Sequence, residues 1–148
     1  MRARYHVRVR EISIMRTIGK LMIPFILLFA LYVQFHGDFG PGGGFQAGVI
    51  FAAGLIVYAL IFGTSELKSH VPERLVEVGI ALGVLIYGGT GLFSLFVGYD
   101  YLDYAALSPH HPQHGQHYGI FLVELGVGIT VASVMLAIFY AFTGRDRQ

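Results

Sequence analysis

The chain has 148 residues, of which 55% are apolar and 13% charged, and its mean hydropathy is +0.63. Because soluble domains carry roughly one-quarter charged residues, this composition excludes an ordinary soluble domain and favours a membrane protein. The chain contains no cysteine, which excludes disulfides and thiolate metal sites, and its net charge of +1 does not select a partner.

The first sixteen residues form a basic arm. In "RARYHVRVRE", basic and apolar residues alternate from Arg2 to Glu11. This pattern is typical of a short strand or of a segment that lies on the membrane surface, attracted to anionic lipid. The alternative is a disordered arm, with the folded domain beginning at Met15.

Four long apolar segments follow the arm, and each is near or above the roughly 18 to 20 residues that cross a bilayer as a helix. They cover residues 17–35, 45–62, 75–97 and 118–142, which leaves a short tail at 145–148. Lipid cannot satisfy backbone N–H and C=O groups, and the sequence lacks the alternating pattern of membrane-barrel strands. It therefore predicts an all-α membrane protein with one domain of four transmembrane helices at 17–144.

The basic residues predict the orientation of this bundle. The ten of them are Arg2, Arg4, Arg8, Arg10, Arg16, Lys20, Lys68, Arg74, Arg145 and Arg147. Neither the turn after the first span nor the loop at 98–117 contains lysine or arginine. Basic residues favour the cytoplasmic side, so both termini and the middle loop are predicted to be cytoplasmic.

A glycine-rich turn, "HGDFGPGGG", joins the first two spans at residues 36–44, and we call it the glycine turn. No Lys-Ser/Thr pair follows its last glycine and no strand precedes it, so it is neither a P-loop nor a dinucleotide fingerprint. Gly40 precedes Pro41, which suits the first turn of the second helix. The free amides of Gly42, Gly43 and Gly44 would then form the positive end of that helix.

Two interpretations of the glycine turn stay open. Bare glycines allow close packing against another backbone, or they leave a polar opening that an ion or water can approach. His36 and Asp38 are the polar side chains nearest to such an opening, unless they are simply solvated residues of an outer turn.

Small residues within the spans predict close helix contacts. Gly79 and Gly83 form a Gly-xxx-Gly pair in the third span. Gly88 and Gly89 weaken the same helix at mid-span, where neighbouring helices must cover the backbone. The cover comes either from partner subunits or from ordinary packing within the bundle.

Two acidic residues near or within the spans are candidates for an ion path or a buried ion pair. Glu124 lies about a turn and a half into the fourth span, where an acidic side chain costs on the order of 3 kcal/mol. It handles a proton or Na⁺, pairs with a partner, or makes a protonated helix contact. Glu77 lies in the first turn of the third span, where the helix dipole accounts for a carboxylate.

The outer loop is rich in histidine, with His110, His111, His114 and His117 in "SPHHPQHGQHYG". This density is compatible with a weak metal site or a pH sensor. Proline and glycine interrupt the segment, so we expect no helix to fix the imidazoles and interpret it as a polar outer loop. We expect no dedicated metal site and no cofactor.

Catalysis by the chain alone is not supported by its residues. The sequence has no cysteine and no Gly-x-Ser-x-Gly elbow, and its histidines lie outside the spans. It also shows no internal repeat of the kind found in secondary transporters. We therefore expect neither an enzyme nor a stand-alone transporter.

The residues around the glycine turn carry a family resemblance. "HGDFGPGGGFQAGVIFAAG", with its Pro41 to Phe45 turn Pro-Gly-Gly-Gly-Phe, resembles the MnhB family, whose members are small subunits of the multisubunit Mrp-type Na⁺/H⁺ antiporters. "YGGTGLF" in the third span and "HYGIFLVELGVGITVASVMLAIFY" in the fourth are similar to the same family. The resemblance covers roughly Met15 to Gly144.

The resemblance implies a small membrane subunit of a complex that exchanges Na⁺ for H⁺ across the prokaryotic cell membrane. Its partners would be the large antiporter-like subunits, the other small subunits and membrane lipid. The subunit would contribute to assembly and to part of the ion path, and nucleic acid would not be a partner. Two alternatives stay open: a homologous subunit of a redox complex such as a membrane-bound hydrogenase, and a purely structural scaffold.

Overall fold

The computed structural model describes residues 2–37, 42–108 and 111–145, and within them the chain forms five α-helices and one short 3-10 helix. These elements are α1 (Arg2–His36), α2 (Gly44–Phe62), α3 (Thr64–His70), α4 (Glu73–Phe96), η1 (Tyr104–Leu107) and α5 (Pro112–Arg145). The described residues contain no strand, so the predicted all-α fold is confirmed.

Four of the helices contain stretches that are long and apolar enough to cross a membrane. The stretches are Ser13–His36, Gly44–Phe62, Glu73–Phe96 and Gln113–Gly144. The four predicted spans are thereby confirmed, and α2 and α4 begin and end within two residues of the prediction.

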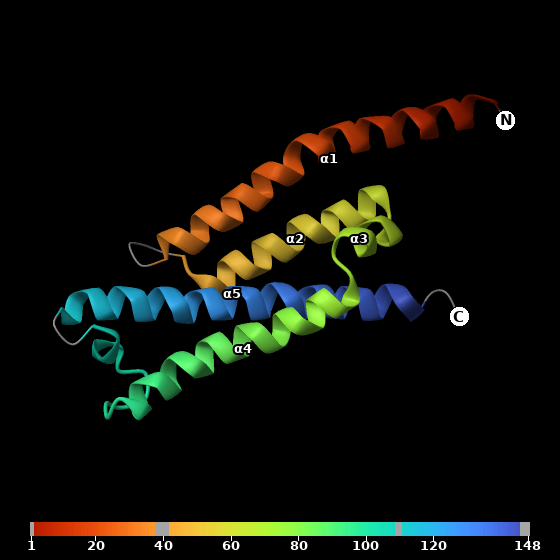
Figure 1. Cartoon of the computed structure of the whole chain (residues 1–148). Coiled ribbons are helices and arrows are strands. Elements are labelled where there is room, and N and C mark those ends of the chain that lie inside the picture. The colour runs from red at the N-terminus through yellow and green to blue at the C-terminus, as the bar shows by residue number, and fades with distance from the viewer. Residues whose placement is uncertain (1, 38–41, 109–110, 146–148) are drawn as a thin grey trace.

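The long helices pack side by side in the order α1, α2, α5, α4 (Figure 1). The start of α1 and the end of α5 lie at one end of the bundle, and the end of α1, the start of α2 and η1 lie at the other (Figure 1). This agrees with an even number of spans. That the end with the termini faces the cytoplasm stays a prediction.

The first helix is longer than its membrane span. The basic arm continues α1 as helix, not as the strand or irregular segment that its alternating pattern suggested, because neither proline nor glycine interrupts residues 2–18. Its 35 residues correspond to about 52 Å at 1.5 Å per residue, well beyond a hydrocarbon core of roughly 30 Å. Attraction of the arm to anionic lipid stays a prediction.

The fourth spanning helix also begins earlier than predicted. α5 begins at Pro112, not at residue 118, because proline lacks an N–H and is well placed in a first helical turn. The predicted loop at 98–117 therefore contains η1 and the first turns of α5. The expectation that no helix holds the histidines was wrong for His114 and His117, which lie on α5.

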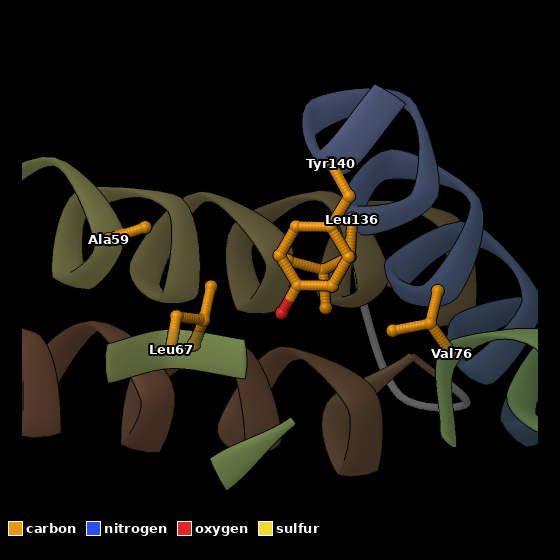
Figure 2. Close-up of a cluster of buried hydrophobic side chains, with 5 residues drawn as sticks. All are labelled: Ala59, Leu67, Val76, Leu136 and Tyr140. Carbon is orange, nitrogen blue, oxygen red and sulfur yellow. The ribbon is translucent and has the colours of Figure 1, made fainter. Parts of the chain in front are cut away.

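At the end with the termini, α3 closes a cluster of buried side chains that we call the α3 cluster. Its members are Ala59, Leu67, Val76, Leu136 and Tyr140 (Figure 2). Gly63, with φ of +109°, ends α2 in a conformation that favours glycine, and the chain then turns into α3. The Tyr140 hydroxyl donates a hydrogen bond of 2.8 Å to the Val71 carbonyl. The cluster thus fixes α2, α3, α4 and α5 together.

Candidate functional site

The carboxyl group of Glu124 lies against the glycine turn. A Cβ atom added at Gly37 would lie 2.8 Å from Glu124 Oε1, and one added at Gly43 would lie 3.0 Å from the same oxygen. Gly37 follows the last residue of α1, and Gly43 precedes the first residue of α2. The acidic side chain of α5 therefore occupies space that only glycines leave free at the junction of three helices.

The backbone of the turn presents the positive end of α2 to this carboxyl group. Gly43 has φ of +118°, which favours glycine, and its carbonyl accepts the hydrogen bond of the Ala47 N–H at 3.0 Å. The N–H groups at 44–46 precede the first helical hydrogen bond and leave partial positive charge at the helix end. A negative side chain beside such an end is stabilised, typically by about 0.3–1 kcal/mol.

The same junction brings two backbones into contact. A Cβ atom added at Gly44 would lie 3.0 Å from Glu124 Cα, and one added at Gly48 would lie 2.7 Å from the Gly128 carbonyl oxygen. Small residues permit this close approach of membrane helices. The close packing that the sequence offered as one interpretation of the glycine turn is therefore present, whereas an opening for an ion or water stays a prediction.

Glu124 lies well along α5 but is level with the start of α2. It is twelve residues after Pro112 (124 − 112), which corresponds to about 18 Å along α5. A Cβ atom added at Gly44, the first residue of α2, would meet the Glu124 backbone. The carboxyl group of Glu124 therefore lies at the end of the bundle where α2 begins.

Sequence reasoning missed a second polar residue at the junction, Gln34. Its side chain is only 7% exposed, and among the described residues its Nε2 has no hydrogen-bond acceptor. A Cβ atom added at Gly128 would lie 3.5 Å from Gln34 Cδ and 3.2 Å from the Gly44 carbonyl oxygen. The available signal was one amide in the apolar run "LLFALYVQFH", which a search for charged residues passes over.

The other candidates of the glycine turn lie around this site. His36 is half-buried and its ring stacks on Tyr32, with 5.2 Å between the ring centroids. Phe35 and Phe121 stack at 5.8 Å, joining α1 to α5 beside the site. Phe45 is 64% exposed. Asp38, Gly40 and Pro41 lie outside the described residues.

Glu77 does not join Glu124. α4 begins at Glu73, so Glu77 lies in its second turn, where it is exposed at the opposite end of the bundle. Glu73 is the acidic residue of the first turn, and it forms an ion pair with Lys68. The Lys68 ammonium also lies 5.0 Å from the centroid of the Tyr140 ring. These charges stabilise the α3 cluster and are distant from the glycine turn.

The glycines of α4 divide into two kinds. A Cβ atom added at Gly83 would lie 2.6 Å from the Gly126 carbonyl oxygen, and one added at Gly79 would lie 3.3 Å from Ser133 Cβ. Both therefore face α5. Gly88 and Gly89 have no heavy atom within 4 Å of such a Cβ, although the helix continues through them without a break.

The described histidines do not gather into a metal site. Within the described part of the chain, no group of three or more His, Cys, Asp or Glu side chains is close enough to hold a metal ion. The rings of His111 and His114 are 5.8 Å apart, and His117 lies farther along α5. His110 lies outside the described residues.

Tyrosines pack the segment between α4 and α5. A Cβ atom added at Gly91 would meet the Tyr101 ring at 2.5 Å, and one at Gly119 would meet Tyr104 Cβ at 2.5 Å. Burial raises the pKa of the Tyr104 phenol above its ordinary value of 10.0, and the neighbouring Tyr87 and Tyr101 raise it further. Tyr104 therefore stays neutral across the physiological range.

A groove of about 570 Å³ crosses the bundle, and all four spanning helices line it. Nearly all of its lining is apolar, with Gln34 and Ser133 as the polar side chains. Ions avoid apolar surroundings in which no ligand replaces their water. The junction at Glu124 is thus a better place for a proton or cation than the groove.

Comparison with known proteins connects this architecture to a family. Residues 14–137 match a family described as a domain related to the MnhB subunit of Na⁺/H⁺ antiporter. The chain belongs to the MnhB family. A Staphylococcus haemolyticus protein described as the antiporter subunit mnhB2 is 32% identical over 133 residues, covering 88% of this chain and 94% of the relative. The Staphylococcus aureus protein of the same description is 30% identical with the same coverage.

MnhB membership confirms the resemblance seen around the glycine turn. With its four apolar helices, the chain is a multi-pass protein of the prokaryotic cell membrane and a small subunit of a Na⁺/H⁺ antiporter complex. The match begins at residue 14 and ends at residue 137, so it includes the glycine turn and most of the four spans but not residues 1–13 of the basic arm.

Proposed function

We propose that this MnhB subunit handles protons at Glu124, while its exposed apolar faces join the other subunits of the antiporter complex. The position of the Glu124 carboxyl group between Gly37 and Gly43 carries the proposal. Na⁺ and H⁺ are the ions that the complex exchanges, and this chain itself performs no covalent catalysis.

The surroundings of Glu124 favour a carboxyl group that can change its charge. Apolar spans disfavour the ionised form, whereas the positive end of α2 favours it. A carboxyl group under these opposing influences can bind and release a proton as its access to water changes. Its place beside the start of α2 supports proton exchange with the side of the membrane on which α2 begins.

The exposed surface of the isolated chain supports a role in assembly. Within each candidate span, no more than 28% of the most apolar window is buried inside the chain. Phe96 and Leu85 on α4 are 86% and 69% exposed, and Gly88 and Gly89 between them leave their backbone open. Close-packed membrane helices use such small residues. We propose that α4 contacts another subunit there.

Substitution of Glu124 by glutamine tests the proton-handling role, because it keeps the shape and removes the charge. In everted membrane vesicles with the whole complex, we expect Glu124→Gln to lower Na⁺/H⁺ exchange by at least about tenfold, the equivalent of about 1.4 kcal/mol. Glu77→Gln, at the opposite end of the bundle, is the matched control and should exchange at the wild-type rate. Wild-type exchange by assembled Glu124→Gln complexes would leave only a scaffold role.

Purification of the tagged chain from its native membrane in mild detergent tests the proposed partners. Large antiporter-like subunits should co-purify and be identified by mass spectrometry. The relatives' descriptions name an antiporter, which favours this outcome over a redox complex. Hydrogenase or dehydrogenase subunits in the same peak would contradict it.

A further inference from the structure

We propose that Gln34 is a positioning residue for Glu124, and that its side-chain amide supports the ionised carboxylate through one bound water. This inference rests on the proposed function, because it assigns a second residue to the same site. It arises from the one buried side-chain nitrogen in the described chain that lacks an acceptor, Gln34 Nε2.

The first step is the reciprocal packing of α1 and α5. Gln34 of α1 fills the space beside Gly128 of α5, and Glu124 of α5 fills the space beside Gly37, which follows α1. Gln34 is three residues before Gly37 and Glu124 is four residues before Gly128, so each polar residue lies about one turn from the glycine on its own segment. Each polar side chain packs on the glycine that the other helix provides.

The second step is the chemistry of the unpaired amide. A buried donor without an acceptor is unfavourable, and the ionised carboxylate is a strong acceptor. A Cβ atom added at Gly128 would lie 2.5 Å from Gln34 Oε1 and 3.2 Å from the Gly44 carbonyl oxygen, so the side-chain amide group of Gln34 and this carbonyl border the same space. A water in this corner would have three polar partners: the Gln34 amide, the Gly44 carbonyl and the Glu124 carboxylate.

The third step is room for the water. Gln34 and Gly128 line the apolar groove, together with Ala47 and Gly48. A buried water needs space and two to four polar partners, and this corner offers both. The groove itself stays apolar, so the water binds where the polar groups converge.

Among the residues that the structure describes, three other titratable residues are named around Glu124. His36 ends α1, Tyr87 of α4 lies beside Gly126, and His117 is on α5 before Glu124. α2 contains no charged residue, and α3 lies at the other end of the bundle. A change of pH dependence in a Gln34 variant, with these groups intact, therefore reports on Glu124.

The test compares Gln34→Met with Gln46→Met in the assembled complex. Methionine keeps the length of the side chain and removes its amide, and Gln46 is an exposed glutamine in the first turn of α2. In Gln34→Met we expect the acid limb of the exchange–pH profile to move upward by about one pH unit, since the carboxylate loses a donor. Gln46→Met should keep the wild-type profile.

Infrared titration gives a second readout that does not depend on transport. The carboxyl band of Glu124 is the one that Glu124→Gln removes, and in Gln34→Met it should appear up to a higher pH. Adding Gln34→Met to Glu124→Gln should change neither spectrum nor residual exchange, because no carboxylate is left to position.

Three results for Gln34→Met would overturn the inference. The first is an exchange–pH profile and a carboxyl band that both match wild type, and the second is a loss of exchange at every pH without a shift of the profile. The third is failed assembly or lower thermal stability of Gln34→Met when Gln46→Met is normal. The last would show that the amide is a packing group with an internal partner. If Glu124→Gln exchanges normally, the proposed function fails, but the infrared band still decides whether Gln34 supports the carboxylate.

Discussion

The carboxyl oxygens of Glu124 in α5 occupy the space that a Cβ atom would need at Gly37, the residue after α1. Gly43 limits the same space from the start of α2. The glycine turn thereby does more than reverse the chain, because it admits an acidic side chain to the meeting point of three helices.

Gly37→Ala is expected to damage this site. The new Cβ would lie 2.8 Å from both Glu124 Oε1 and Gly43 Cα, so the carboxyl group or the turn must move. Overpacking of this kind costs about 1–3 kcal/mol. We expect lower thermal stability of the complex and slower Na⁺/H⁺ exchange. Gly144→Ala, near the end of α5 and with no neighbour within 4 Å, is the control and should be neutral or slightly stabilising.

Gly83→Ala is expected to separate α4 from α5. Its Cβ would lie 2.6 Å from the Gly126 carbonyl oxygen and 2.7 Å from the Thr130 nitrogen, and a helix backbone cannot yield locally. Subunit yield and the midpoint of thermal denaturation in detergent should fall, again by about 1–3 kcal/mol in stability. Gly144→Ala, which meets no neighbour within 4 Å, provides the comparison. Equal stability of the two variants would show that the α4–α5 contact is looser than described.

The spans could be predicted from the sequence because hydropathy and length report directly on the membrane. Their limits were accurate for α2 and α4, where glycine and proline border the apolar run. They were too short for α1 and α5, because hydropathy falls at the membrane surface while the helix continues into water. α3 was missed, since seven residues between two spans carry no clear helical period.

The candidate site could be predicted only in parts. Glu124 and the glycine turn each drew attention from the sequence, one as a charge in an apolar run and the other as a glycine cluster. Their contact depends on which faces of α1, α2 and α5 meet, and hydropathy is nearly uniform around these helices. Gln34 shows the same limit, because its importance comes from Gly128, ninety-four positions later (128 − 34).

Tyr140→Phe is expected to weaken the α3 cluster. The substitution removes the 2.8 Å hydrogen bond to the Val71 carbonyl while leaving the 5% exposed ring in place. We expect a loss of about 1 kcal/mol in the free energy of unfolding. Tyr58→Phe, on α2 near the same end, is a control in which no described hydrogen bond is lost. A loss of the same size in both variants would mean that the Val71 bond contributes nothing specific.

We predict that ionisation of the Tyr104 phenol lowers the stability of the folded protein at alkaline pH. Its pKa is raised in the folded protein above the ordinary 10.0, first by burial and then by Tyr87 and Tyr101, so folding favours the neutral phenol. The unfolded chain therefore releases this proton at lower pH than the folded chain. The stabilisation is complete below pH 10.0 and is lost as the pH rises through the folded pKa.

Thermal denaturation of purified complexes across this pH range should show a shallower decline of the denaturation midpoint with pH for Tyr104→Phe than for wild type. Tyr99→Phe, an exposed tyrosine of the same segment, should decline as wild type does. Identical slopes for Tyr104→Phe and wild type would show that the Tyr104 phenol is equally well solvated before and after folding.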